Sequence, residues 1–172
     1  DHRPAFETLW GQRVTSIMDL KFSHVDVLVE DLEKTVSYYE KILGFRPSER
    51  QVWKREDFQV AFVVMFKDKE RIFFAHPISG NLKDLLEERG EGTIYRYCYM
   101  SKDLRACYRE LVASGVQPED QNGEPLAEGD LDDPLGGIPC IWLPKAFGSL
   151  SLEILAEREM ERFMDKLRST IT

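Results

Sequence analysis

The feature that most constrains the fold of this chain is an internal repeat. The segment HVDVLVEDLEKTVSYYEKILGFRP (24–47) has a weaker second copy, RYCYMSKDLRACYRELVASGVQP (96–118). Each copy predicts a short strand, then an Asp-Leu pair, then one amphipathic helix that ends near a glycine. A single deletion aligns the whole of the two copies, which indicates a duplicated structural unit.

Apolar runs that are typical of strands follow each predicted helix. They lie at 59–66 and 71–75 after the first helix, and at 138–143 and 150–155 after the second. Together with the repeat, they predict an α+β fold built from two βαβββ modules. The alternative is a generic α+β domain whose two helices merely look alike. We expect a single domain at 22–156 with modules 22–78 and 93–156, an N-terminal extension at 1–21 and a C-terminal helix at 157–172.

Composition and charge limit the partners of the chain. A hydrophobic content of 42% in 172 residues is ample for one core. The net charge of -8, without a basic cluster, argues against nucleic acid and anionic membrane surfaces. No apolar run approaches the ~20 residues that span a bilayer, and no signal-peptide core is present. We therefore expect a cytoplasmic protein that binds a small molecule.

The three cysteines do not predict a disulfide framework or a zinc site. Cys98, Cys107 and Cys140 are odd in number, and none belongs to a CxxC pair. We interpret them as small core residues in a reducing compartment.

Segments outside the repeat have simpler interpretations. Residues 1–21 contain Phe6, Leu9 and Trp10 and can form a short helix over a sheet edge. Residues 79–92 predict a helical turn, and the acidic segment 118–137, rich in Pro and Gly, predicts a long loop that is either solvated or a lid. Residues 157–169 predict an amphipathic helix that docks on its own domain or on a second subunit. We expect a homodimer.

Two side chains stand out as candidates for chemistry. Alternation along the first strand places His24 and Asp26 on the face opposite the valines, and alternation along the last strand places Glu153 among apolar neighbours. A carboxylate in such a position is costly to bury unless it is paired or binds a metal. His24 and Glu153 are therefore candidate partners across a curved sheet, either as a functional pair or as a buried structural one.

The segment FSHVDVLVEDLEKTVSYYEKILGF (22–45) resembles the opening of the vicinal oxygen chelate superfamily. This superfamily includes glyoxalase I, extradiol dioxygenases, methylmalonyl-CoA epimerase and bleomycin- or fosfomycin-type resistance proteins. RIFFAHPISG (71–80) and IPCIWLPKAFGSLSLEILA (138–156) resemble the ends of the two half-units in the epimerase. The resemblance spans about residues 22–156, and it implies that the two modules form a cupped mixed sheet.

The resemblance also implies a divalent metal, held by one residue from each of four strands. His24 and Glu153 match two of these positions, whereas Phe73 and Arg96 stand at the other two. Oxygen and nitrogen ligands would favour Zn, Mn, Co, Ni or Fe over a thiolate metal. One interpretation completes the site with His76, Asp26 or Tyr95. The other has Arg96 supply the positive charge in place of a metal.

The mechanism that the resemblance implies is the stabilisation of an enolate or oxyanion in a cup with little water. Arg96 is the candidate oxyanion partner, and Glu153, His24 or Glu56 is the candidate base. The candidate residues for substrate binding are Tyr95, Phe73 and Trp142.

The function expected from these residues is that of an epimerase, isomerase or lyase acting beside a carbonyl, with an acyl thioester as one substrate class. The alternative is a non-catalytic protein that binds a small molecule or sequesters an antibiotic in the cup. Extradiol dioxygenase activity is disfavoured because the second module lacks the required histidine. Substitution of His24 or Glu153 separates the two functions, because it abolishes turnover in an enzyme but only alters affinity in a binding protein.

Overall fold

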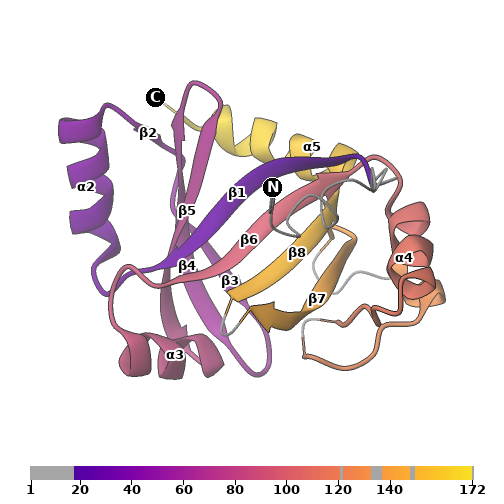
Figure 1. Cartoon of the computed structure of the whole chain (residues 1–172). Helices are drawn as coiled ribbons and strands as arrows, with labels where there is room; N and C mark the ends of the chain where they lie inside the picture. The colour runs from indigo at the N-terminus through magenta and orange to yellow at the C-terminus, as the bar shows by residue number, and fades with distance from the viewer. Residues whose placement is uncertain (1–17, 121, 133–136, 148–149, 172) are drawn as a thin grey trace, which may run out of the picture.

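The strands that the structure describes form one mixed, eight-stranded sheet (Figure 1). The computed structural model describes residues 18–120, 122–132, 137–147 and 150–171. The strand order is β2-β4-β5-β1-β6-β8-β7, and β3 pairs with β4. The elements of the first module are β1 (Leu20–Leu28), α2 (Leu32–Leu43), β2 (Arg46–Pro47), β3 (Gln51–Lys54), β4 (Gln59–Lys67) and β5 (Glu70–Ser79). The rest are α3 (Asn81–Arg89), β6 (Ile94–Ser101), α4 (Leu104–Ala113), the 3-10 helix η1 (Glu128–Asp132), β7 (Cys140–Phe147), β8 (Leu150–Ala156) and α5 (Glu157–Arg168).

The two repeats occupy equivalent places in the sheet. β1 runs parallel to β5, β6 runs parallel to β8, and the two modules meet where β1 and β6 pair antiparallel. The α+β fold predicted from the repeat and the cupped mixed sheet implied by the family resemblance are thus confirmed. In the second module, Glu119 forms an isolated antiparallel bridge with Trp142 of β7. The segment around Glu119 is rich in Pro and Gly, which are depleted in strands, and its described residues form isolated bridges in place of a longer strand.

The Asp-Leu pairs of the repeat are helix starts. The side chain of Asp31 accepts a hydrogen bond from the backbone N–H of Lys34, and that of Asp103 accepts one from Ala106, each at 2.9 Å. These are N-cap interactions that satisfy otherwise unpaired N–H groups of α2 and α4. α2 ends at Gly44, whose φ of 72° lies in the left-handed region that glycine adopts without strain.

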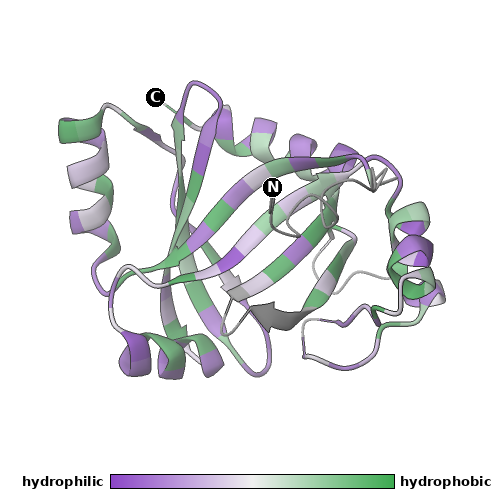
Figure 2. Ribbon diagram, in the orientation of Figure 1, coloured by the Kyte–Doolittle hydropathy of each residue, from purple (hydrophilic) through white to green (hydrophobic). Residues whose placement is uncertain are grey.

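α2 and α4 pack on one face of the sheet, which we call the outer face. Leu32 of α2 belongs to a buried cluster with Met65 and Phe74, and Leu111 of α4 to another with Ile154. Figure 2 shows the alternation of apolar and polar residues along the strands that produces this layering. The other face of the sheet, the cup face, carries His24, Asp26 and the residues in register with them.

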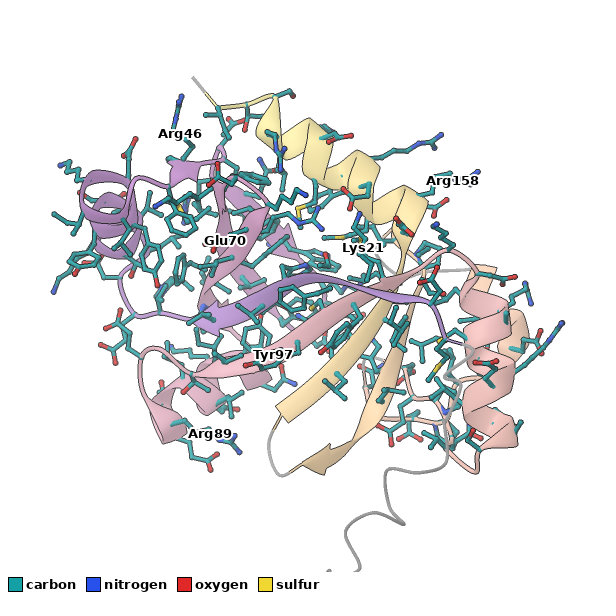
Figure 3. The ribbon with its side chains drawn as sticks, turned by 45° about the horizontal axis from the view of Figure 1, so that its top comes forward. Lys21, Arg46, Glu70, Arg89, Tyr97 and Arg158 are labelled. Carbon is teal, nitrogen blue, oxygen red and sulfur yellow. The ribbon has the colours of Figure 1, made fainter. Side chains whose placement is uncertain are left out.

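The C-terminal helix α5 lies on the cup face. Its buried residues are Met160, Met164 and Leu167, and they pack against a group of strand residues from both modules: Val64, Phe66, Cys98, Met100 and Leu155. Lys21 of β1 lies 3.6 Å from Glu157 and 3.4 Å from Glu161, and Figure 3 shows Lys21 beside the helix. Of the two docking modes left open by the sequence, the structure shows docking on the helix's own domain.

The helix α3 covers the opposite end of the cup face. Leu86 of α3 packs with Leu28, Val60 and Ala75. The segment is a nine-residue helix where the sequence predicted only a turn. Gly80 precedes it, and a Cβ atom there would lie 2.5 Å from Cβ of Phe58, so the close approach of α3 to the β3–β4 turn requires glycine.

Several expectations concern segments that the structure describes only in part. Phe6, Leu9 and Trp10 lie outside the described residues. The segment 118–137 contains η1 and the Glu119 bridge, but residues 121 and 133–136 lie outside the described ranges, so the lid remains a prediction. Strand β1 begins at Leu20, two residues before the expected domain boundary. Within the described ranges, no helix is both long enough and apolar enough to cross a membrane.

Candidate functional site

A row of polar side chains crosses the cup face at the junction of the modules. His24 on β1 is in register with Cys98 on β6, and Cys98 is in register with Glu153 on β8. Asp26 pairs with Arg96 in the next row. His24, Asp26 and Glu153 are exposed by only 4%, 4% and 6%, so each needs a partner within the protein.

Arg96 supplies the partner for both buried carboxylates. Its Nε lies 2.7 Å from Oδ2 of Asp26, and its Nη1 lies 2.5 Å from Oε2 of Glu153. The guanidinium carbon also lies 5.1 Å from the ring centre of Tyr95 and 4.4 Å from that of Trp142. Both distances are within the range of cation–π attraction. The Arg96 cation is therefore surrounded by four of the candidate residues, Asp26, Glu153, Tyr95 and Trp142.

The charge states follow from this arrangement. Burial alone would raise the pKa of Asp26, but the Arg96 guanidinium and then His24 lower it below its ordinary value. Burial would lower the pKa of Arg96, yet Glu153 and Asp26 raise it well above its ordinary value. Burial raises the pKa of the Tyr95 phenol and of the Cys98 thiol, which are therefore neutral at physiological pH.

Two irregularities in the pairing of β1 with β6 shape the site. Phe22 pairs with Tyr99 and His24 with Cys98, so Ser23 is an extra residue on β1. Asp26 pairs with Arg96 and Val27 with Ile94, so Tyr95 is an extra residue on β6. Bulges re-aim side chains, and here Ser23 contacts His24 while Tyr95 contacts Arg96. Simple alternation places Tyr95 on the same face as Tyr97 and Tyr99, so it could not predict that Tyr95 contacts Arg96.

Aromatic side chains form the rest of the site wall. The Phe73 ring lies 4.2 Å from the His24 ring and 5.6 Å from the Phe62 ring, centre to centre. Phe163 of α5 lies 6.5 Å from Phe62. Trp142 is in register with Glu153, and its indole N–H is a buried donor that has no oxygen acceptor among the described residues.

Two other candidates lie apart from this group. Glu56 is exposed in the turn between β3 and β4. His76 directs its Nδ1 to the backbone oxygen of Val29 at 3.1 Å. Two surface hollows also lie elsewhere, one beside Arg46 and Arg168 and the other along the polar side of α5.

The fit of a divalent metal depends on Arg96. One ligand atom each from His24, Asp26 and Cys98 lies within 4.8 Å of the others, which makes this trio a candidate metal site. However, metal ligands must be deprotonated, and the raised pKa of Cys98 favours the thiol. The Arg96 guanidinium also contacts both Asp26 and Glu153, so a cation already balances the two carboxylates. As arranged, the residues do not fit a divalent ion.

The paired modules and the polar row on the cup face define a protein of the glyoxalase-like cup class. The family model of the glyoxalase/bleomycin resistance protein/dioxygenase superfamily matches residues 23–131, well over half of the chain. The chain belongs to this superfamily, which is the one indicated by the sequence. No curated protein sequence gives a significant match to the chain.

Solved structures share the fold at low sequence identity. A hypothetical protein of Bacillus halodurans is 19% identical with a TM-score of 0.62, and the match covers 80% of this chain and 94% of that one. Methylmalonyl-CoA epimerase of Mycobacterium tuberculosis is 19% identical with a TM-score of 0.60, covering 83% and 90%. A mutant 4-hydroxymandelate synthase of Streptomyces coelicolor is 16% identical with a TM-score of 0.62, covering 80% of this chain and 48% of that one. At these identities the likeness shows the fold alone.

Proposed function

We propose that this chain is an epimerase, isomerase or lyase that acts beside a carbonyl group, with acyl thioesters as the first substrate class to test. Arg96 stabilises the enolate or oxyanion that forms in the cup. The observation that carries the proposal is the position of the Arg96 guanidinium, which is held between two buried carboxylates at the centre of the cup face. Family membership and the fold of the epimerase support it.

Arg96 retains donor capacity for a substrate oxygen. A guanidinium has five N–H donors. Nη1 of Arg96 donates to Glu153, whereas Nε forms an ion pair with Asp26 but makes no hydrogen bond within the described residues. Within the described part of the chain, its Nη2 makes only a long contact of 3.5 Å with the Tyr95 hydroxyl. The Arg96 side chain is 16% exposed, so it is not sealed from the solvent side. A preorganised donor aimed at developing negative charge contributes about 3 kcal/mol to the stabilisation of the transition state.

The proposed reaction moves a proton without a redox change. A base, Glu153 or His24, takes the proton on the carbon beside the carbonyl, and the carbonyl oxygen becomes an enolate oxygen that accepts from Arg96. Delivery of a proton from solvent to the opposite face of the carbon completes an epimerisation, and the base releases the first proton to solvent. Loss of a β leaving group instead completes a lyase reaction. In this proposal Arg96 takes the electrostatic role that a divalent metal has in the superfamily.

Exchange of the carbon-bound proton with solvent tests the proposal directly. A panel of acyl-CoA thioesters that bear a proton beside the carbonyl, methylmalonyl-CoA included, is incubated with the full chain in D2O, and proton NMR follows loss of that signal. We expect exchange with at least one thioester, and a decrease of about 100-fold in Arg96→Met. Arg158→Met is the matched control, since Arg158 is exposed and pairs only with its neighbour Glu159 among the contacts described. Absence of exchange across the panel, or equal exchange in the two variants, contradicts the proposal.

The alternative function is non-catalytic binding of a small molecule in the cup. The stacked Phe62 and Phe73 rings, with Phe163 nearby, favour it because they suit a flat or apolar ligand. Calorimetric binding of an aromatic ligand, weakened by Phe73→Ala and without turnover of any substrate, would support this function. The homodimer and the cytoplasmic location remain predictions, and light scattering of the purified chain measures the first.

A further inference from the structure

We infer that Ser23 and Arg71 are positioning residues that hold His24 as a neutral imidazole with its proton on Nε2. The catalytic consequence, that His24 cannot be the base, rests on the proposed function. The protonation pattern of His24 does not depend on the proposed function, because it follows from hydrogen bonds on the cup face.

These residues form a continuous buried chain of contacts. Arg71 directs Nε to the backbone oxygen of Ser23 at 3.1 Å and Nη2 to its hydroxyl oxygen at 3.4 Å. The Ser23 hydroxyl oxygen lies 2.8 Å from Nδ1 of His24. Nε2 of His24 lies 3.3 Å from Oδ1 of Asp26. Arg71, Ser23, His24 and Asp26 are all at most 8% exposed, so water does not offer ready alternative partners.

The direction of each hydrogen bond follows from what each group can donate. A guanidinium only donates, so the Ser23 oxygen accepts from Arg71. The Ser23 hydroxyl proton then needs an acceptor, and among its contacts in the described part of the chain this acceptor is Nδ1 of His24. A buried hydroxyl without an acceptor is costly, so Nδ1 carries no proton. Nε2 therefore carries the proton and donates it to the carboxylate of Asp26.

This pattern leaves His24 with no lone pair for the chemistry. Nδ1 is occupied by Ser23, and Nε2 is protonated and faces Asp26. His24 can therefore neither take a proton from a substrate nor bind a metal unless its hydrogen bonds with Ser23 and Asp26 are broken. Its role is to orient Asp26, which in turn holds the Arg96 guanidinium. Of the two candidate bases, Glu153 remains.

At the other end of this row of contacts, Arg71 forms an ion pair with α5. Nη1 of Arg71 lies 3.1 Å from Oε2 of Glu161, whose side chain is 33% exposed. Burial raises the pKa of Glu161, but the hydrogen bond and the charge of Arg71, together with Lys21, lower it by more, so the ion pair persists at neutral pH. Arg71 thus links the seating of α5 to the orientation of Ser23.

His76 provides an internal reference with the opposite tautomer. Its Nδ1 lies 3.1 Å from the backbone oxygen of Val29, which can only accept a hydrogen bond. Nδ1 of His76 therefore carries a proton, whereas Nδ1 of His24 does not. The two described histidines should be distinguishable in one spectrum.

Long-range proton–nitrogen NMR of the full chain, with 15N in the histidine rings and at neutral pH, tests the inference. We expect the His24 signals to show an unprotonated Nδ1 and a protonated Nε2. His76 should show a protonated Nδ1, and the His76→Gln variant assigns its signals by their loss. A protonated Nδ1 on His24, whether as the other tautomer or as an imidazolium, would overturn the inference even if no substrate is ever found.

Substitutions at Ser23 test its positioning role separately. Ser23→Ala should shift the His24 nitrogen signals away from the single-tautomer positions, and Ser23→Thr, which keeps the hydroxyl, should restore them. Ser114→Ala is the control, because Ser114 is exposed at the end of α4. Unchanged His24 signals in folded Ser23→Ala would show that Ser23 does not position the ring. If turnover is found and is lost in Glu153→Gln while His24→Gln retains the larger part, Glu153 is the base; the reverse result excludes the catalytic consequence but not the tautomer.

Discussion

Nη1 of Arg96 and Oε2 of Glu153 lie 2.5 Å apart and join β6 to β8 as a diagonal pair on the cup face. Arg96 is in register with Ser151, and Glu153 with Cys98, so the two side chains lean toward each other along the strands. The same guanidinium contacts Asp26 through Nε. One buried cation thus balances two acids that come from different modules.

The pair should show strong coupling in a double-mutant cycle. Arg96→Met leaves two carboxylates without their cation, and we expect a loss of about 3–5 kcal/mol in the free energy of unfolding in urea. The double variant Arg96→Met, Glu153→Gln should lose less than the sum of the single variants, by at least about 1 kcal/mol. Arg158→Met, at an exposed position, should change stability by less than about 0.5 kcal/mol. Additive losses would show that Arg96 and Glu153 do not interact in solution.

Asp26 should make stability depend on acid pH. Burial raises its pKa, but Arg96 and His24 together lower it by more, so the folded-state pKa lies below the unfolded value of about 3.9. Ionised Asp26 therefore stabilises the fold above that pH, and this contribution is lost as the pH falls through the folded-state pKa. We expect Asp26→Asn to be about 3 kcal/mol less stable than the wild type at neutral pH. The stability difference between the wild type and Asp26→Asn should shrink below about pH 4. A difference in the free energy of unfolding in urea that stays constant across this pH range would show that Asp26 is not ionised in the folded protein.

The packing of α5 on the cup face should contribute a large part of the free energy of unfolding. Met164 is 1% exposed and packs on the cup face with Val64 and Leu155. Met164→Ala should cost about 2–5 kcal/mol, because it leaves a cavity between the helix and the sheet. Arg162→Ala on the exposed side of the same helix controls for helix propensity and should cost less than about 0.5 kcal/mol. Equal effects of the two variants would mean that α5 is not docked on the cup face.

Much of the fold could be predicted because the repeat is local and periodic. Asp31 and Asp103 mark the helix starts, and the alternation of Val25, Val27 and Val29 assigns the outer face of β1. The docking of α5 could not be settled, since an amphipathic stripe fits its own domain or a partner equally well. Its buried methionines identify the side that packs but not the surface that receives it.

The candidate site could be predicted only in part. Alternation places His24, Asp26 and Glu153 on the cup face, but the contact partners depend on register between strands that are far apart in sequence. The bulges at Ser23 and Tyr95 break that alternation, and no residue pattern in this sequence predicts them. Ser23 and Arg71 were therefore missed as partners of His24. The only available signal was a buried-looking histidine, which needs hydrogen-bond partners of some kind.

Metal analysis of the purified chain tests the central claim most directly, namely that the Arg96 guanidinium stands where the superfamily places a divalent ion. Wild type and Arg96→His are each equilibrated with Mn, Co, Ni, Fe or Zn, desalted without chelator and analysed by mass spectrometry of the elements. We expect no stoichiometric ion in the wild type, and about one ion per chain in Arg96→His, where an imidazole replaces the cation beside Asp26 and Glu153. A stoichiometric ion in the wild type that is lost in His24→Ala or Glu153→Gln would contradict it.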